Sequence, residues 1–186
     1  GLIPENELSD EAGVDIDPIT GGPVVNDSME TSVGGIFACG NVVHVHDLVD
    51  NVTEESRIAG RGAAELILGG LNENGYDNTV WVSAGKGIRY VVPQKVSFEH
   101  LINPAYKYPK SEVKLLFRVN GVYSNVRINL MAGGETIHSI KRIKAAPGEM
   151  ESMVITKKLM EKLIAKFNNF DIAEHKKEVI VQLEEV

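Results

Sequence analysis

Apolar and polar residues alternate over most of the chain from Val80 onward, and this pattern constrains the fold more than any other feature. A period of two places one face of a strand in a core and the other in solvent. The clearest case is residues 113–130, where two alternating runs flank Asn120 and Gly121, the pair preferred in type I′ turns. We therefore predict a β-hairpin over residues 113–130.

The rest of this region continues the pattern. Further strands are predicted at 135–143, 153–155 and 178–186, with glycine-rich turns between them. One segment differs, because residues 156–167 carry apolar side chains at helical spacing behind Thr156, a suitable N-cap. About seven short strands with one helix predict a mostly β, sandwich-like domain over residues 79–186.

The first part of the chain has a different organisation. A short acidic helix is predicted at 4–13, and a small hairpin at 14–25. Residues 36–39 then form a continuous apolar run between glycines, which is typical of a strand buried on both faces in an α/β layer. A turn of buried helix is the alternative, and the shortness of the run disfavours it.

A helix is predicted over residues 51–70, with Asn51 as the N-cap, Glu54 three residues later, and two glycines at the end. Residues 59–64 are almost without side chains, although glycine costs about 1 kcal/mol relative to alanine inside a helix. This favours close approach of the helix backbone to a sheet or ligand, with an ordinary surface helix as the alternative. A polar linker at 71–78 then separates a first region, 1–78, from a second, 79–186.

Composition narrows the function classes. The chain has 186 residues, 43% of them hydrophobic, and a formal net charge of −7, which argues against a nucleic-acid surface. No window approaches the roughly 18 consecutive apolar residues of a membrane helix, and no leader is apparent, so we expect a cytoplasmic protein without a membrane span. Cys39 is the only cysteine, which excludes an intrachain disulfide, and we expect it to be a small buried hydrophobe.

The apolar run at 36–39 ends in Gly40 and Asn41, and the predicted helix begins shortly after. Such a strand end and a helix N-terminus together form a polar cradle at the edge of an α/β sheet, where ligands bind. The segments "TSVGGIFACGN" and "TEESRIAGRGAAELI" resemble the second flavin-binding motif of FAD-dependent pyridine-nucleotide oxidoreductases, over residues 1 to about 70. The positions that match the motif are Thr31, Ile36, Phe37, Ala38, Gly40 and Asn41.

The resemblance implies that residues 1–78 are the end of an FAD-binding, Rossmann-like α/β domain. It also implies a set of cofactor-binding residues: Gly40, Asn41, Val52, Thr53 and Glu54. Asn41 replaces the family's usual Asp, so it keeps a hydrogen-bonding oxygen and loses the charge. In the intact protein, electrons would pass from NAD(P)H through FAD to a substrate or partner subunit.

No GxGxxG turn occurs in the sequence, so the seats for the FAD and NAD(P) pyrophosphates would belong to a missing N-terminal region. We therefore expect this chain alone to be inactive and to bind neither cofactor. Uncovered apolar surface would also favour a homo-oligomer. The alternative is a non-catalytic module in which the β-sandwich mediates oligomerisation or docking.

His44 and His46 lie in an insert, "VVHVHDLVD", that the simplest family members lack. They permit a metal pair, but only Asp47 and Asp50 are close in sequence to complete it, and a structural site needs about four ligands. Either histidine could instead donate a proton or pair with charge near the flavin. Ordinary loop histidines remain the favoured interpretation, so we predict no metal site and assign no catalytic residue.

Overall fold

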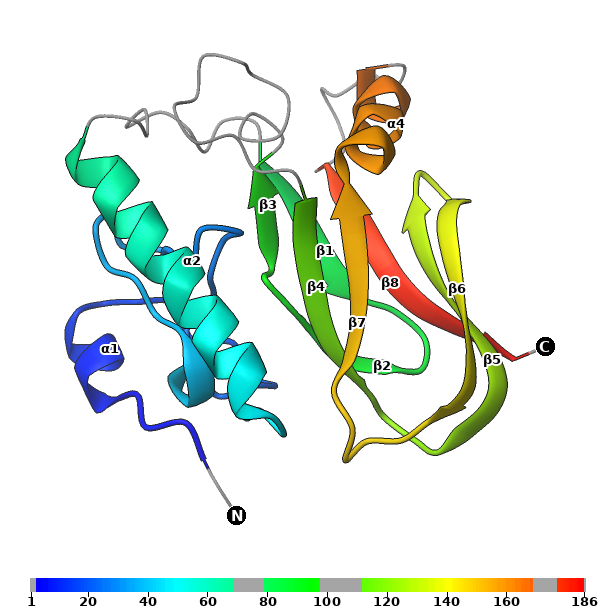
Figure 1. Cartoon of the computed structure of the whole chain (residues 1–186), viewed down its shortest axis with the longest axis horizontal. Coiled ribbons are helices and arrows are strands. Elements are labelled where there is room, and N and C mark those ends of the chain that lie inside the picture. The colour runs from blue at the N-terminus through cyan, green and yellow to red at the C-terminus, as the bar shows by residue number, and fades with distance from the viewer. Residues whose placement is uncertain (1–2, 69–78, 98–111, 169–176, 186) are drawn as a thin grey trace. The chain divides into compact units, whose positions relative to one another are not determined.

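The computed structural model describes residues 3–68, 79–97, 112–168 and 177–185 (Figure 1). The chain divides into two compact units. Unit 1 comprises Gly1–Gly75 with Pro93–Lys95, and unit 2 comprises Tyr76–Val92 with Val96–Val186. The predicted linker at 71–78 and the glycines predicted to end the second helix lie outside the described residues. Among the described helices, none combines the length and apolarity that crossing a membrane would require.

Unit 2 is mostly β and contains two sheets, which confirms the β-rich part of the predicted fold. One sheet has the strand order β3-β1-β8-β5-β6 and the other β2-β4-β7. β1 and β8 pair in parallel, whereas β5 pairs with β6 and β8, and β4 with β2 and β7, in antiparallel fashion. The elements are β1 (Thr79–Ala84), β2 (Ile88–Val92), β3 (Lys95–Ser97), β4 (Glu112–Val119), β5 (Tyr123–Ala132), β6 (Glu135–Ala145), β7 (Glu151–Thr156), α4 (Lys157–Asn168) and β8 (Glu178–Glu185).

The predicted hairpin over 113–130 is wrong, although both of its strands exist. β4 and β5 belong to different sheets, so the chain crosses from one sheet to the other at Asn120 and Gly121. A type I′ turn needs a positive φ at both central residues, and neither Asn120 nor Gly121 has one. The tight hairpin forms instead between β5 and β6, where Gly133 (φ 54°) and Gly134 (φ 77°) supply that geometry.

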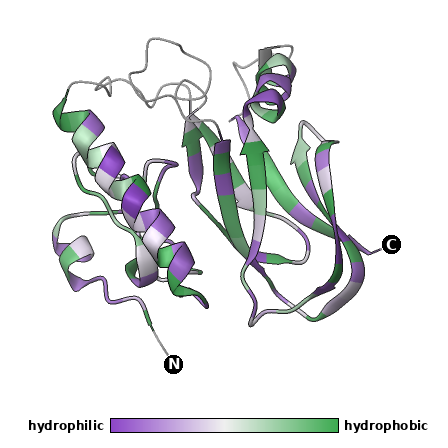
Figure 2. Cartoon of the chain, in the orientation of Figure 1, coloured by the Kyte–Doolittle hydropathy of each residue, from purple (hydrophilic) through white to green (hydrophobic). Residues whose placement is uncertain are grey.

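The core of unit 2 is apolar and continuous across both sheets. Its largest fully buried side chains include Phe117 from β4 and Ile128 from β5. α4 adds Met160 and Leu163 to the same cluster, and its start is confirmed by the Thr156 hydroxyl, which accepts a hydrogen bond from the Leu159 N–H at 3.4 Å. In Figure 2, β7 and β8 carry long hydrophobic stretches.

Unit 1 contains α1 (Glu7–Glu11), the short 3-10 turn η1 (Gly40–Val42) and α2 (Val49–Ile67). α1 is shorter than the predicted helix at 4–13 because Asn6 gives its side-chain amide to the carbonyls of Gly21 and Val42 and does not cap α1. The predicted hairpin at 14–25 forms around one antiparallel bridge between Ile16 and Pro23.

The strand predicted at residues 36–39 does not form. Phe37 makes one antiparallel bridge with Glu30, and Ile36 is exposed rather than buried on both faces. Positive φ angles at Gly35 (82°) and Gly40 (71°) turn the backbone at both ends of this run. Across the described residues 3–68, strand pairing is limited to isolated bridges, so a Rossmann-like sheet is not seen there.

α2 begins at Val49, and its N-cap residue is Leu48, which makes no side-chain capping bond. The predicted capping role of Asn51 is therefore wrong, since Asn51 lies within the first turn. Hydrophilic and hydrophobic residues alternate along α2 in Figure 2. Its buried positions are unusual for a helix, because two are glutamates and two have minimal side chains: Glu55, Ala59, Gly62 and Glu65.

Gly62 and Gly60 provide a matched pair that tests this packing. A Cβ at Gly62 would lie 2.7 Å from the Ser28 carbonyl oxygen and 2.9 Å from a Phe37 ring carbon, whereas a Cβ at Gly60 would meet nothing within 4 Å. We expect Gly62→Ala to destabilise unit 1 by about 1–3 kcal/mol through overpacking. Gly60→Ala should stabilise it by about 1 kcal/mol through helix propensity. Chemical denaturation, monitored by amide hydrogen exchange, would measure the change in unfolding free energy of unit 1 in each variant. Changes of the same sign in the two variants would contradict this packing.

Candidate functional site

The Gly40–Asn41 turn packs on the first turns of α2. Gly40 has a φ of 71°, which only glycine adopts without strain, and it is buried. A Cβ at this position would lie 3.1 Å from a Val52 methyl carbon, and the Gly40 N–H donates to Glu55 Oε2 at 2.7 Å. The structure thus brings together two of the predicted cofactor-binding residues, Gly40 and Val52.

The other predicted residues lie on the surface. Asn41 is exposed, and its Oδ1 accepts a hydrogen bond from the His46 backbone N–H at 3.0 Å. Thr53 and Glu54 are also exposed, and the Thr53 hydroxyl donates to the Val49 carbonyl at 3.0 Å. Asn41 therefore stabilises the loop that follows it while remaining accessible to solvent.

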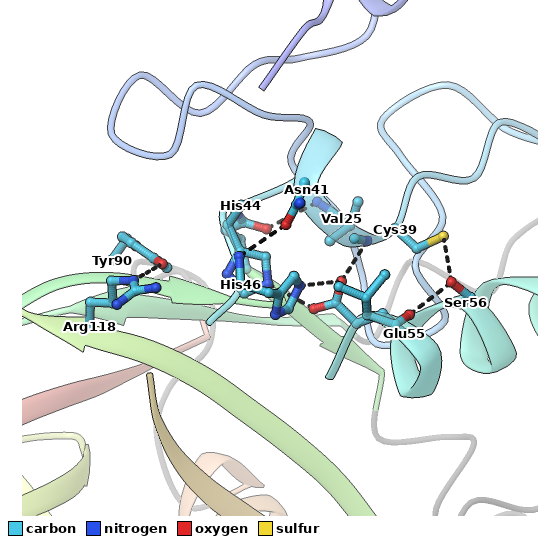
Figure 3. Close-up of polar contacts among 12 residues, drawn as sticks. Val25, Cys39, Asn41, His44, His46, Glu55, Ser56, Tyr90 and Arg118 are labelled. Atoms are coloured by element: carbon cyan, nitrogen blue, oxygen red, sulfur yellow. Dashed lines mark hydrogen bonds and ion pairs between the residues drawn. The ribbon is translucent and has the colours of Figure 1, made fainter. Parts of the chain in front are cut away.

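A buried cluster of His44, His46 and Glu55 lies directly beneath this turn (Figure 3). His44 Nε2 is 2.7 Å from Glu55 Oε1, and His46 Nε2 is 3.0 Å from Oε2. The two ring centroids are 4.2 Å apart. The side chains of both histidines are 1% exposed and that of Glu55 is 6% exposed. One buried carboxylate therefore accepts hydrogen bonds from two imidazoles and a backbone amide where solvent does not reach.

Local structure explains why the two histidines converge. The backbone N–H groups of Val43 and His44 both bond to the Gly40 carbonyl, which closes η1 and directs the chain toward α2. The two rings converge on the same carboxylate, because His44 Nε2 and His46 Nε2 each contact one oxygen of Glu55. Glu55 meets them from the second turn of α2, on the helix's buried face.

The environment of Glu55 strongly favours the ionised carboxylate. Burial raises the pKa of Glu55, but the hydrogen bonds from His44 and His46, and the positive charge of these rings when they are protonated, lower it by more. The pKa therefore falls from 4.5 to about 2. Glu55 is therefore a hydrogen-bond acceptor throughout the physiological pH range.

The hydrogen bonds to Glu55 also define the imidazoles. Each Nε2 faces a carboxylate oxygen, so in the neutral form the proton lies on Nε2 and the lone pair on Nδ1. His46 Nδ1 is buried and has no hydrogen-bond partner among the described residues.

The sequence did not indicate Glu55. Asp47 and Asp50, the predicted neighbours of the histidines, are exposed and do not join the cluster. The available signal was the spacing of small residues at positions 59 and 62, which marks the buried face of α2 and places Glu55 on it. A glutamate on a buried face needs a polar partner.

The predicted burial of Cys39 is wrong. Cys39 is only half-buried, and its thiol lies 3.7 Å from the Ser56 hydroxyl.

No protein-family model, curated protein or solved structure matches this chain. Its function is therefore inferred from the chemistry of its own residues.

Proposed function

We propose that unit 1 is the flavin-contacting end of an FAD-dependent, NAD(P)-linked oxidoreductase. The observation that best supports this is the Gly40–Asn41 turn, which is anchored to the start of α2 from below and leaves Asn41 exposed. α2 begins without a side-chain cap, and the Asn51 N–H in its first turn donates to the Leu48 carbonyl at 3.2 Å. The partial positive charge of this helix end would favour a negatively charged group nearby. Together these features suit a polar ligand that carries hydroxyl groups and gathers negative charge.

Each residue has a distinct role in this proposal. Gly40 lacks a side chain, so its backbone can pack against Val52 and hold the turn that presents Asn41. Asn41 Oδ1 is already bonded to the His46 N–H, which leaves its amide group as the donor to a hydroxyl of the flavin's sugar-alcohol chain. The N-terminus of α2, which begins at Val49 and continues through Val52 and Thr53, would stabilise negative charge on the reduced flavin. FAD supplies the hydride and electron chemistry when bound.

Other parts of the oxidoreductase would come from outside these residues. The phosphate-binding GxGxxG turns are absent from the sequence, so a preceding nucleotide-binding region would hold the FAD and NAD(P) pyrophosphates. NAD(P)H would reduce the flavin, which then passes electrons to a substrate or partner subunit.

A second role, oligomerisation or docking through unit 2, has support from one feature of its surface. β6 forms one edge of the five-stranded sheet, and Ile143 on β6 is 85% exposed. An exposed edge strand with an apolar side chain can pair with a second copy of the chain. This role is compatible with flavin binding by unit 1.

Substitution of Asn41 tests the flavin proposal. In the full-length protein, Asn41→Leu removes the amide and should weaken flavin binding. Each 1.4 kcal/mol of binding free energy lost raises the dissociation constant about tenfold. Asn41→Asp is the matched control, because one carboxylate oxygen can accept the His46 N–H while the other accepts from the flavin hydroxyl, which then donates in place of the lost amide. We expect Asn41→Asp to retain flavin. Equal flavin retention by Asn41→Leu and the wild type would contradict the assignment.

A further inference from the structure

We propose that His44, His46 and Glu55 form a binding site for a divalent transition-metal ion, with Zn²⁺ as the most suitable probe. These three residues support the Gly40–Asn41 turn from within and are not among the proposed flavin contacts, so the inference does not depend on flavin binding.

The spacing of the ligand atoms carries the proposal. One ligand atom from each residue lies within 4.8 Å of the other two. Zinc binds imidazole nitrogen and carboxylate oxygen at about 2.0–2.2 Å, so ligand atoms around one ion are about 3–3.5 Å apart. The contacts from Glu55 oxygens to His44 Nε2 (2.7 Å) and His46 Nε2 (3.0 Å) are within about 0.5 Å of that spacing. Small movements of the loop that carries the histidines would admit an ion.

The chemistry of the donors selects the class of ion. Two imidazole nitrogens with one carboxylate suit Zn²⁺, Fe²⁺, Ni²⁺ or Cu²⁺, whereas Mg²⁺ and Ca²⁺ prefer oxygen ligands alone. With both imidazoles neutral, the buried cluster carries the single negative charge of Glu55, which a cation would compensate. Three protein ligands also leave a coordination position for water or another donor, as in catalytic zinc sites.

Burial distinguishes this cluster from exposed acidic groups. The three side chains are at most 6% exposed and come from two segments, the loop after η1 and the second turn of α2. A bound ion would therefore tie that loop to the helix. Metal binding through Nε2 moves the ring proton to Nδ1, which in His46 has no acceptor among the described residues. The site should consequently bind less tightly than one in which each histidine donates its other ring N–H to a carboxylate or carbonyl.

Titration of the metal-stripped protein with Zn²⁺ by calorimetry, and with Co²⁺ by visible absorbance, tests the proposal. We expect one ion per chain, and affinity at least about tenfold lower in Glu55→Gln and His46→Asn. Asp47→Asn and Asp50→Asn are the controls, because these carboxylates are nearby in sequence but exposed. Their affinity should equal that of the wild type. No binding by the wild type, or undiminished binding by His46→Asn, would overturn the proposal.

A second measurement keeps the test independent of how well the variants fold. In the wild-type protein, NMR correlations of the imidazole nitrogens should show both His44 and His46 shifting on addition of Zn²⁺, while His138 on β6 does not. If the signals of His44 and His46 move with pH but not with Zn²⁺, the cluster binds a proton rather than a metal and the proposal is wrong.

Discussion

Replacing Glu55 with alanine is expected to lower the free energy of unfolding of unit 1 by about 3–5 kcal/mol. The substitution removes the carboxylate that accepts the buried Gly40 N–H and contacts two buried imidazole nitrogens. A buried donor without an acceptor costs about 1–3 kcal/mol. The sole tryptophan, Trp81, lies in unit 2, so amide hydrogen exchange in residues 40–66 is the appropriate measurement.

The neighbouring Glu54 is the matched control, because it is exposed on the same helix. Glu54→Ala should change stability by no more than about 0.5 kcal/mol. Equal effects of Glu54→Ala and Glu55→Ala would show that the buried cluster contributes nothing to stability.

Acid provides an independent check on Glu55. Its pKa in the folded protein, about 2, lies below the ordinary value of 4.5, so the ionised carboxylate stabilises the fold above about pH 4.5. That contribution is lost as the pH falls toward 2. The stability difference between the metal-free wild type and Glu55→Gln should therefore shrink across this range, and a difference that grows instead would contradict the lowered pKa.

Phe117→Ala should destabilise unit 2 by about 3–5 kcal/mol, because Phe117 is fully buried between the two sheets' core side chains. Urea denaturation followed by the fluorescence of Trp81 on β1 would measure the change. Val122→Ala is the control, since Val122 is 71% exposed. A loss below about 1 kcal/mol for Phe117→Ala would mean that the core does not have the packing described here.

Local pattern was enough to predict β4 to β8 and α4 in unit 2, because alternation and capping depend on neighbouring residues. It was not enough to predict which strands pair. Asn120-Gly121 has the composition of a hairpin turn, yet β4 and β5 find partners elsewhere, and the two-glycine turn before β6 makes the hairpin. Which strands pair depends on how the two sheets share one core. That information lies in contacts between residues far apart in the sequence, and a short segment does not contain it.

Unit 1 departed further from its prediction, and its polar interior is the physical reason. The apolar run at 36–39 indicated a buried strand, but its flanking glycines turn the chain and its single bridge partner is Glu30. The histidines were recognised as candidates, whereas Glu55 was not, because the rotation of α2 that buries it is set by contacts from distant residues such as Ser28. Gly40 and Asn41 were identified correctly as one turn, and their contact with flavin stays a prediction.

The visible absorbance spectrum of the full-length protein, purified without added cofactor, tests the flavin assignment most directly. We expect the absorbance bands of bound flavin and their bleaching on addition of NADH or NADPH. A protein that folds, contains both units and shows no flavin absorbance, even after incubation with FAD, would contradict the proposal that the Gly40–Asn41 turn contacts this cofactor.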